Sequence, residues 1–221
     1  MIVTIDGPAG AGKSSAARGL ADHLGYRFLD TGAMYRAITL AGMRQQIDWQ
    51  DSEALVRIAA GADLTLPDDQ VFLNGEDVTQ AIRTFEVTSL THYAADNQTV
   101  RQLLVDLQQQ IAAHTDTVTE GRDQATVVFP HAECKIYLTA SDEVRAQRRY
   151  EDLLIRGEKV TFDEVLSKQK QRDLRDLKRE IGGLRKAEDS IELSTDGLTT
   201  EQVIQQLVQI VRGRVTDKNQ V

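Results

Sequence analysis

The sequence predicts an α/β fold in three layers (α/β/α), with a central parallel sheet between helices. First, short apolar strands alternate with a helical segment: Ile2–Ile5 and Tyr26–Leu29 are apolar runs, and the apolar residues from Ala16 to Leu24 recur at every third or fourth position. Strands joined by a helical crossover lie parallel in one sheet. Second, the first strand runs directly into a glycine-rich turn, Gly7–Gly12, which opens the first helix.

The rest of the chain continues this alternation. Ser141 is suited to cap a helix, and Thr199 with Gln202 to form a capping box for the last helix. Further strands are expected at Thr117–Glu120, Lys135–Leu138 and Ser190–Leu193. A helix is expected to start at Asp30–Gly32, with Met34, Ile38 and Ala41 on one face, and further helices at Glu86–Ala95, at Val100–Ala113 and over most of Arg145–Glu188. Between residues 62 and 79 the pattern predicts a small β-hairpin, with a turn at Pro67–Asp69.

Composition and charge exclude several classes of protein. The chain has 221 residues, of which 41% are hydrophobic and 27% charged, as in a globular protein with a buried core. Its net charge of −8 argues against broad binding to nucleic acid or to an anionic membrane. We find no transmembrane segment and no signal peptide, and the single cysteine, Cys134, fits a reducing cytoplasm.

The glycine-rich turn matches the pattern G-x-x-x-x-G-K-[ST] in full. Its residues, with the serine that follows, are Gly7, Pro8, Ala9, Gly10, Ala11, Gly12, Lys13, Ser14 and Ser15. The glycines let successive N–H groups face one phosphate, and the next helix adds the positive end of its dipole. In this P-loop, Lys13 is expected to reach the β- and γ-phosphates of ATP, and the Ser14 hydroxyl to bind Mg²⁺. The fold is therefore expected to be that of a P-loop NTPase.

Three features favour a kinase within this fold. No Asn-Lys-x-Asp segment is present to read guanine, and no apolar strand ends in the acidic pair typical of motor or transport ATPases. A short core, a hairpin-bearing insert and a late arginine-rich helical region suit an enzyme that closes over two substrates. Closure matters because water competes with the acceptor as nucleophile.

Several segments resemble bacterial cytidylate kinases, in the order in which that family has them. The matching segments are Asp30–Arg36, Leu73–Thr79 with Ile82–Thr84, Glu120–Asp123 with Thr126–Pro130, and Arg172–Asp176. The resemblance runs from about residue 1 to 212. It implies one kinase domain with a core (about 1–36, 114–148 and 186–212), a monophosphate-binding insert (about 37–113) and a helical lid (about 149–185).

The resemblance also implies an acceptor site. Arg36 would clamp the acceptor phosphate bidentately, with Thr31 donating a hydroxyl and Tyr35 beside it. Arg83 and Arg101 would contact the same monophosphate. For each arginine the alternative is an ordinary ion pair on a solvated helix.

A second group follows a core strand and the late helical region. Arg122 and Asp123 come just after a strand, at the edge where α/β proteins bind ligands. Asp123 is suited to accept from the cytosine amine and Arg122 to contact phosphate or base, with a mutual or structural salt bridge as the alternative for the pair. The resemblance makes Arg172 and Arg179 phosphate or base contacts and Asp176 a ribose contact. Arg172, Arg175 and Arg179 are spaced to share one helix face, and the alternative is an exposed helix that carries charges of both signs. Arg145, Arg148 and Arg149 are candidates to stabilise the transferring phosphoryl group, with helix ion pairs as the alternative; Lys13, Arg122, Arg149 and Arg172 form our catalytic set.

The chain departs from the family pattern where the base is read and in the lid. His92 stands where the family has a small hydroxyl residue, Ala125 replaces a glycine, Lys178 replaces an asparagine, and Gly182-Gly183 replaces Ala-Pro. The resemblance therefore bears more directly on phosphoryl transfer than on the choice among CMP, dCMP and UMP.

We expect a cytoplasmic, monomeric kinase that uses ATP and Mg²⁺ to phosphorylate CMP and dCMP, with neither nucleic acid nor membrane as partner. The first alternative is the same architecture acting on UMP or a small alcohol. Such an alcohol would not need Arg122, Asp123 and Asp176 as base and ribose readers. The second is a regulatory nucleotide-binding protein, against which the intact Lys13 and Ser14 count.

Overall fold

The computed structural model describes residues 1–67, 69–155 and 157–218, so Asp68 of the expected turn lies outside the described residues. The chain divides into two compact units. Unit 1 joins Met1–Tyr26 to Asp116–Val221, and unit 2 is Arg27–Thr115. The finer division into core, insert and lid stays a prediction.

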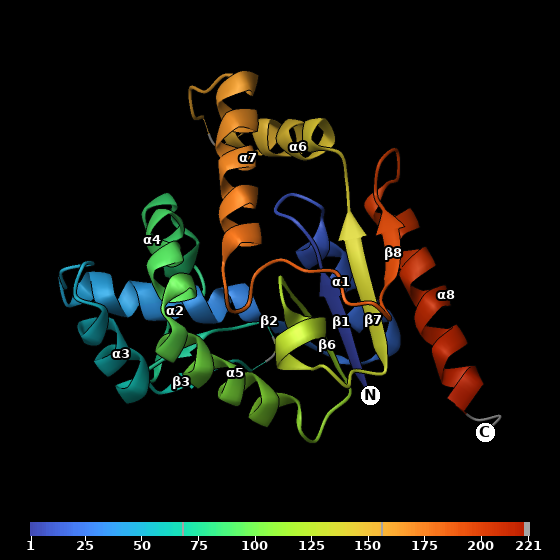
Figure 1. Cartoon of the computed structure of the whole chain (residues 1–221), viewed down its shortest axis with the longest axis horizontal. Coiled ribbons are helices and arrows are strands. Elements are labelled where there is room, and N and C mark those ends of the chain that lie inside the picture. The colour runs from blue at the N-terminus through green and yellow to red at the C-terminus, as the bar shows by residue number, and fades with distance from the viewer. Residues whose placement is uncertain (68, 156, 219–221) are drawn as a thin grey trace. The chain divides into compact units, whose positions relative to one another are not determined.

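The central sheet has the strand order β2-β6-β1-β7-β8 (Figure 1). Its strands are β1 (Ile2–Asp6), β2 (Arg27–Asp30), β6 (Thr117–Gly121), β7 (Cys134–Thr139) and β8 (Ile191–Ser194). Within unit 1, β1 pairs in parallel with β6 and β7, and β7 pairs in parallel with β8. The α/β fold class is confirmed, and each predicted strand forms with its ends within one residue of the expected ones.

Burial on both faces explains why β1 is central. Val3 and Ile5 point to one face and Thr4 and Asp6 to the other, and all four are almost fully buried. Helix α1 (Lys13–Leu24) packs against α8 (Thr200–Lys218) in the same unit. Because β1, β6 and β7 are parallel, their carboxyl ends meet at one edge, where the P-loop begins.

The predicted helix caps are confirmed. The Ser141 hydroxyl accepts a backbone N–H of the first turn of α6 (Asp142–Ile155) at 3.4 Å. Before α8, Thr199 and Gln202 each accept the other's backbone N–H, at 2.9 and 3.2 Å. A further capping box joins Thr161 and Glu164 at the start of α7 (Phe162–Lys178). Caps of this kind stabilise a helix by about 1 kcal/mol each.

The end of α7 differs from the prediction. Residues 145–188 were expected to be mostly helical, and α6 and α7 do occupy most of this stretch, but α7 ends at Lys178 and Arg179 has extended backbone. Arg179 therefore does not share a helical face with Arg172 and Arg175. The glycines explain the ending: Gly182 has a φ of 69°, and a Cβ on Gly183 would lie 2.4 Å from the Arg179 carbonyl oxygen.

Unit 2 packs its helices around an apolar core. The helices are α2 (Thr31–Arg44), α3 (Ser52–Gly61), α4 (Phe85–Asp96) and α5 (Gln98–Ala112), with a 3₁₀ turn, η1 (Ala81–Arg83). Met34, Ile38 and Ile82 are almost fully buried in this core, and Leu55 and Leu104 pack with them. The three predicted helices of this stretch, α2, α4 and α5, are confirmed, and α3 was missed.

The predicted hairpin is confirmed and gains a third strand. Strands β3 (Leu64–Thr65), β4 (Phe72–Leu73) and β5 (Glu76–Asp77) form a small antiparallel sheet in that order. Asn74 and Gly75 connect β4 to β5 with φ angles of 52° and 81°, as the tight two-residue turn of a hairpin requires. The Asn-Gly pair was the available signal for this third strand.

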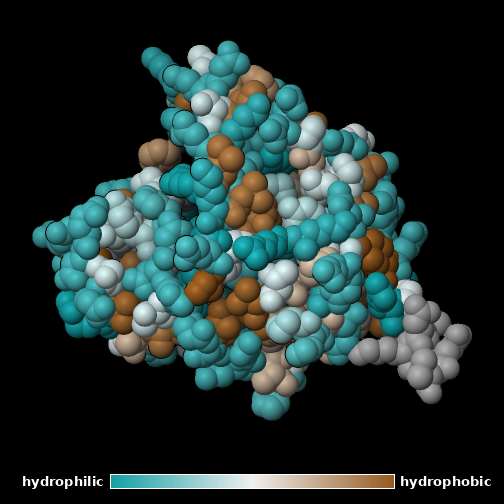
Figure 2. All heavy atoms as spheres, viewed as in Figure 1, coloured by the Kyte–Doolittle hydropathy of each residue, from teal (hydrophilic) through white to brown (hydrophobic). Residues whose placement is uncertain are grey.

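Polar and charged residues cover most of the face shown in Figure 2. Among the described residues, we find no helix with both the length and the apolar character needed to span a membrane.

Candidate active site

The predicted phosphate-binding segment is a loop between β1 and α1 whose backbone requires glycine. Gly10 and Gly12 have φ angles of 81° and 85°, in the left-handed region. A Cβ on Gly7 would lie 1.9 Å from the Leu138 carbonyl oxygen of β7, so a side chain there would collide with the sheet. Gly12 is the N-cap of α1, and the unpaired N–H groups of that first turn are suited to an anion.

Lys13 is buried among cations. Lys13 is 5% exposed, and its Nζ donates to the Pro8 carbonyl oxygen at 2.8 Å. Burial, and then the positive charges of Arg122 and Arg172, lower the pKa of Lys13 to about 7, against the opposing effect of Glu120. A bound polyanion would offset the repulsion between these cations, so the arrangement favours phosphate.

A carboxylate that the sequence analysis missed lies beside Ser14. The Ser14 hydroxyl donates to Glu120 Oε1 at 2.8 Å, and Glu120 is buried at the end of β6. The available signal was an acidic residue ending a strand predicted to lie in the same sheet as the P-loop strand. The two side chains fit Mg²⁺, which takes few protein oxygens and completes its shell with phosphate and water. Among the described residues, no three His, Cys, Asp or Glu side chains form a metal-binding group.

Asp6 is a second missed residue. It ends β1, is 1% exposed, and accepts the backbone N–H groups of Gln124 at 2.9 Å and Ala125 at 2.7 Å. Burial raises the pKa of Asp6 to about 7, although these two hydrogen bonds act in the opposite direction. Asp6 therefore ties the start of the P-loop to the π-helical turn η2 (Gln124–Val128), which follows the predicted Arg122–Asp123 pair.

Arg122, Asp176 and Arg179 are brought together. Arg122 Nε lies 2.8 Å from Asp176 Oδ2, and Arg179 Nη2 lies 3.3 Å from Asp176 Oδ1. Burial disfavours the charged form of both groups, but their mutual attraction and hydrogen bond outweigh it. Asp176 therefore raises the pKa of Arg122, and Arg122 lowers the pKa of Asp176. The predicted ribose contact of Asp176 stays a prediction.

The remaining predicted residues of unit 1 differ in their surroundings. Asp123 is buried, whereas Arg172 is exposed on α7 and Arg149 is partly exposed on α6. Arg148 donates to the Thr195 hydroxyl and carbonyl at 3.0 Å each, next to β8. Arg145 is buried in ion pairs. Of the three α6 arginines, the structure thus engages two in contacts within the protein.

In unit 2, predicted acceptor residues gather at the start of α2. Asp30 caps this helix, accepting a backbone N–H of its first turn at 2.9 Å, and Arg83 Nη2 lies 3.4 Å from Asp30 Oδ2. A Cβ on Gly32 would lie 3.0 Å from Arg36 Nη2, so the Arg36 guanidinium folds over this glycine. Thr31 is buried in the same turn. Two of the predicted guanidinium groups thus lie at one helix N-terminus.

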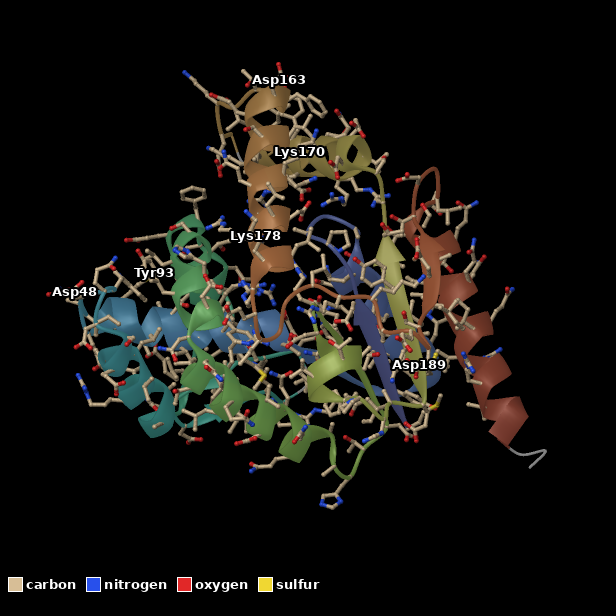
Figure 3. The ribbon with its side chains drawn as sticks, viewed as in Figure 1. Asp48, Tyr93, Asp163, Lys170, Lys178 and Asp189 are labelled. Atoms are coloured by element: carbon tan, nitrogen blue, oxygen red, sulfur yellow. The ribbon has the colours of Figure 1, made fainter. Side chains whose placement is uncertain are left out.

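The third predicted arginine of unit 2 lies against a tyrosine. The Arg101 guanidinium carbon is 5.7 Å from the centre of the Tyr35 ring, and Arg101 is 5% exposed. His92, which departs from the family pattern, has its ring centre 4.2 Å from that of Tyr93, which also contacts Trp49 at 5.3 Å. The His92 side chain is therefore held by an aromatic group of α4, in which Figure 3 labels Tyr93.

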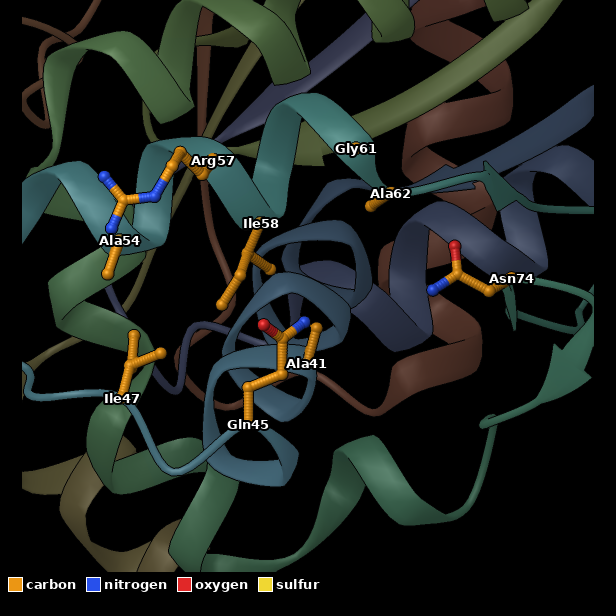
Figure 4. A pocket seen from close by; sticks show the side chains of 9 residues that line it. All are labelled: Ala41, Gln45, Ile47, Ala54, Arg57, Ile58, Gly61, Ala62 and Asn74. Carbon is orange, nitrogen blue, oxygen red and sulfur yellow. The ribbon is translucent and has the colours of Figure 1, made fainter.

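A cavity in unit 2 takes no part in this constellation. It has a volume of about 280 Å³ and lies between α2, α3 and the Asn74 turn (Figure 4). Ile47, Ile58 and Ala62 give it apolar walls, and Arg57 reaches its rim. None of the predicted site residues lines it.

The fold and the site together define a class. Phosphoryl transfer needs positioning and charge neutralisation, and a phosphotransferase obtains both from a P-loop, with its lysine and serine, and from convergent arginines. This chain has the P-loop and arginines in each unit, and its predicted site residues include no nucleophile–base pair. The chain is a P-loop kinase.

Comparison with known proteins gives the family. The model of the family described as cytidylate kinase matches residues 3–213. A cytidylate kinase of Rhodopirellula baltica is 50% identical over 212 residues, covering 96% of this chain and 93% of that protein. One of Bacillus subtilis is 42% identical over 213 residues, covering 95% of each. The chain belongs to the cytidylate kinase family, a family of nucleoside-monophosphate kinases.

Solved structures support the fold at low identity. A shikimate kinase from Bacteroides thetaiotaomicron covers 96% of this chain and 98% of its own, with a TM-score of 0.50 and 13% identity. An uncharacterised protein from Eubacterium ventriosum has a TM-score of 0.53 and 12% identity. At such identities these structures bear on the P-loop kinase fold alone.

Proposed function

We propose that this chain transfers the γ-phosphoryl group of ATP to the phosphate of CMP or dCMP, giving ADP and CDP or dCDP. The observation that carries the proposal is the convergence of Lys13, Arg122 and Arg172 in a chain of the cytidylate kinase family. The proposal includes a monomeric enzyme in the cytoplasm. The single cysteine, Cys134, which is buried in β7, supports the reducing compartment.

The transfer needs no protein nucleophile. An oxygen of the acceptor phosphate attacks the γ-phosphorus in line, and the bond from γ-phosphorus to the β,γ-bridging oxygen breaks, so that ADP leaves. Lys13 and the α1 N-terminus hold the donor phosphates, and Arg122 and Arg172 neutralise charge on the transferring group. Arg149, partly exposed on α6, has the same predicted role. Mg²⁺, held by Ser14 with Glu120 beside it, would polarise the phosphates when bound.

Unit 2 supplies the acceptor site in this proposal. Arg36 and Arg83, which flank Asp30, bind the acceptor phosphate with the Thr31 hydroxyl, and Arg101 with Tyr35 binds beside them. From unit 1, Asp123 accepts from the cytosine amine, a donor that uracil lacks. Asp176 contacts the ribose, with Arg179 next to it.

The test is ADP formation, measured in a coupled assay with ATP and Mg²⁺. CMP, dCMP, UMP, AMP and GMP are offered separately, and Lys13→Ala is the control. We expect fast turnover with CMP and dCMP, and a loss of about 100-fold or more in the variant. A protein that binds ATP but turns over none of the monophosphates would refute the proposal and redirect it to non-nucleotide acceptors.

A further inference from the structure

The Arg145 guanidinium is a buried hub between the P-loop and α7. Arg145 is 3% exposed. Its Nη1 donates to the Ala9 carbonyl oxygen of the P-loop at 2.8 Å and to Asp173 Oδ2 of α7 at 2.6 Å. Its Nε donates to the Ala140 carbonyl oxygen at 3.1 Å, and Nη2 pairs with Asp142 at the start of α6. One side chain therefore joins the end of β7, the P-loop, the start of α6 and the helix α7.

Packing at Gly10 supports the same junction. A Cβ on Gly10 would lie 3.1 Å from Arg145 Cβ and 3.4 Å from Gln169 Oε1, so the P-loop backbone rests directly on α6 and α7. Gln169, one turn before Asp173, also donates through Nε2 to the Asp142 carbonyl oxygen at 3.2 Å. The helices α6 and α7 pack against each other in the same unit. The contact is therefore made by backbone as well as by charge.

The position of Asp173 in the sequence links the Arg145 contacts to the predicted site residues of α7. Asp173 directly follows Arg172, whose charge acts on both Lys13 and Asp176, and it lies three residues before Asp176, the partner of Arg122. Anchoring Asp173 thus fixes the turn of α7 that carries both residues. The labelled Asp163, Lys170 and Lys178 in Figure 3 mark the length of this helix.

We propose that Arg145 and Asp173 are positioning residues: their largely buried ion pair holds α7 on the P-loop backbone, so that Arg172 faces the donor phosphates and Asp176 stays paired with Arg122. Neither residue needs to touch substrate. The inference rests on the proposed function for its kinetic part. Its structural part, the anchoring of α7, does not.

The test compares Asp173→Asn with Asp152→Asn. Both exchange a carboxylate for an amide, but Asp152 is exposed on α6 and shares none of these contacts. We expect Asp173→Asn to lower kcat about 10-fold to 100-fold, with the Kd of ATP changed less than about threefold, because a misplaced group costs mostly in the transition state. Asp152→Asn should match the wild type.

Arg145→Lys and the double variant show whether the two residues act as a pair. Lysine keeps the charge but cannot hold Ala9, Asp142 and Asp173 together. If they form one unit, Arg145→Lys with Asp173→Asn should lose little more than Arg145→Lys alone. Full additivity of the two losses would overturn the pairing.

Amide hydrogen exchange of the apo protein gives a readout without turnover. We expect faster exchange across 162–178 in Asp173→Asn and unchanged exchange in α8, even if CMP is not the acceptor. Unchanged exchange in α7 would overturn the proposal, as would a kcat within about twofold of wild type despite faster exchange. If the proposed function were wrong, the wild-type protein itself would show no turnover of CMP or dCMP.

Discussion

The missing side chain of Gly32 leaves room for the Arg36 guanidinium. A Cβ there would lie 3.0 Å from Arg36 Nη2 and 3.4 Å from Asp30 Oδ1. Gly32→Ala should therefore move Arg36 by a few tenths of an ångström, while alanine favours the helix by about 0.5–1 kcal/mol over glycine. We expect the KM for CMP to rise about threefold to tenfold, with kcat and stability maintained.

The control for this prediction is Gly61→Ala. Gly61 ends α3, and an added Cβ would meet nothing within 4 Å. Steady-state kinetics and urea unfolding of both variants decide the matter. An unchanged KM in Gly32→Ala would mean that Arg36 does not hold the acceptor phosphate from its present position.

Single residues were predictable where a motif fixes their role. Lys13 and Ser14 follow from the P-loop pattern, because the chemistry dictates their spacing. Glu120 and Asp6 were missed because their roles come from strand register: Ile5 pairs with Glu120, and this alignment brings the ends of β1 and β6 together. Nothing local in the sequence announces that pairing.

At the scale of elements, Asp6 links the end of β1 to η2 and has a consequence for stability. Its pKa, about 7, lies above the ordinary value of 3.8. The folded state therefore binds more protons than the unfolded state between these values, so the contribution of Asp6 falls as pH rises from about 4 to about 7 and is constant above that.

Asp6→Asn removes this titration. The unfolding free energy of wild type should exceed that of the variant by less at pH 7.5 than at pH 5.5. We expect this difference to shrink by about 1–2 kcal/mol, because the pKa of Asp6 is higher in the folded state than in the unfolded state. Urea unfolding at both pH values measures it. A constant or growing advantage would show that the Asp6 carboxylate is ionised throughout.

Elements were predictable where periodicity is strong. The strands of the central sheet formed within one residue of expectation, and apolar residues predominate in β1 and β7. The end of α7 was not predictable from charge spacing, because the close approach of Gly183 to the Arg179 carbonyl overrides the helical repeat. The third strand β5 is two residues long, and the Asn74-Gly75 turn rather than any apolar pattern specifies it.

At the scale of the whole molecule, the two units carry different parts of the proposed reaction. The P-loop with Lys13 belongs to unit 1, and Arg36, Arg83 and Arg101 belong to unit 2. Each unit has its own core, so loss of a cation in one should leave the binding surface of the other intact. Two single variants can therefore separate donor from acceptor binding.

We expect Lys13→Ala to raise the Kd of ATP at least about tenfold while the Kd of CMP stays within about threefold of wild type, because Lys13 neutralises only the donor phosphates. Arg36→Ala should do the reverse, since a bidentate clamp on the acceptor is lost. Titration calorimetry of each variant with each nucleotide alone measures both constants without turnover. If each variant weakened the binding of both nucleotides equally, the assignment of Lys13 to the donor and of Arg36 to the acceptor would be wrong, and the two nucleotides would share their phosphate-binding residues.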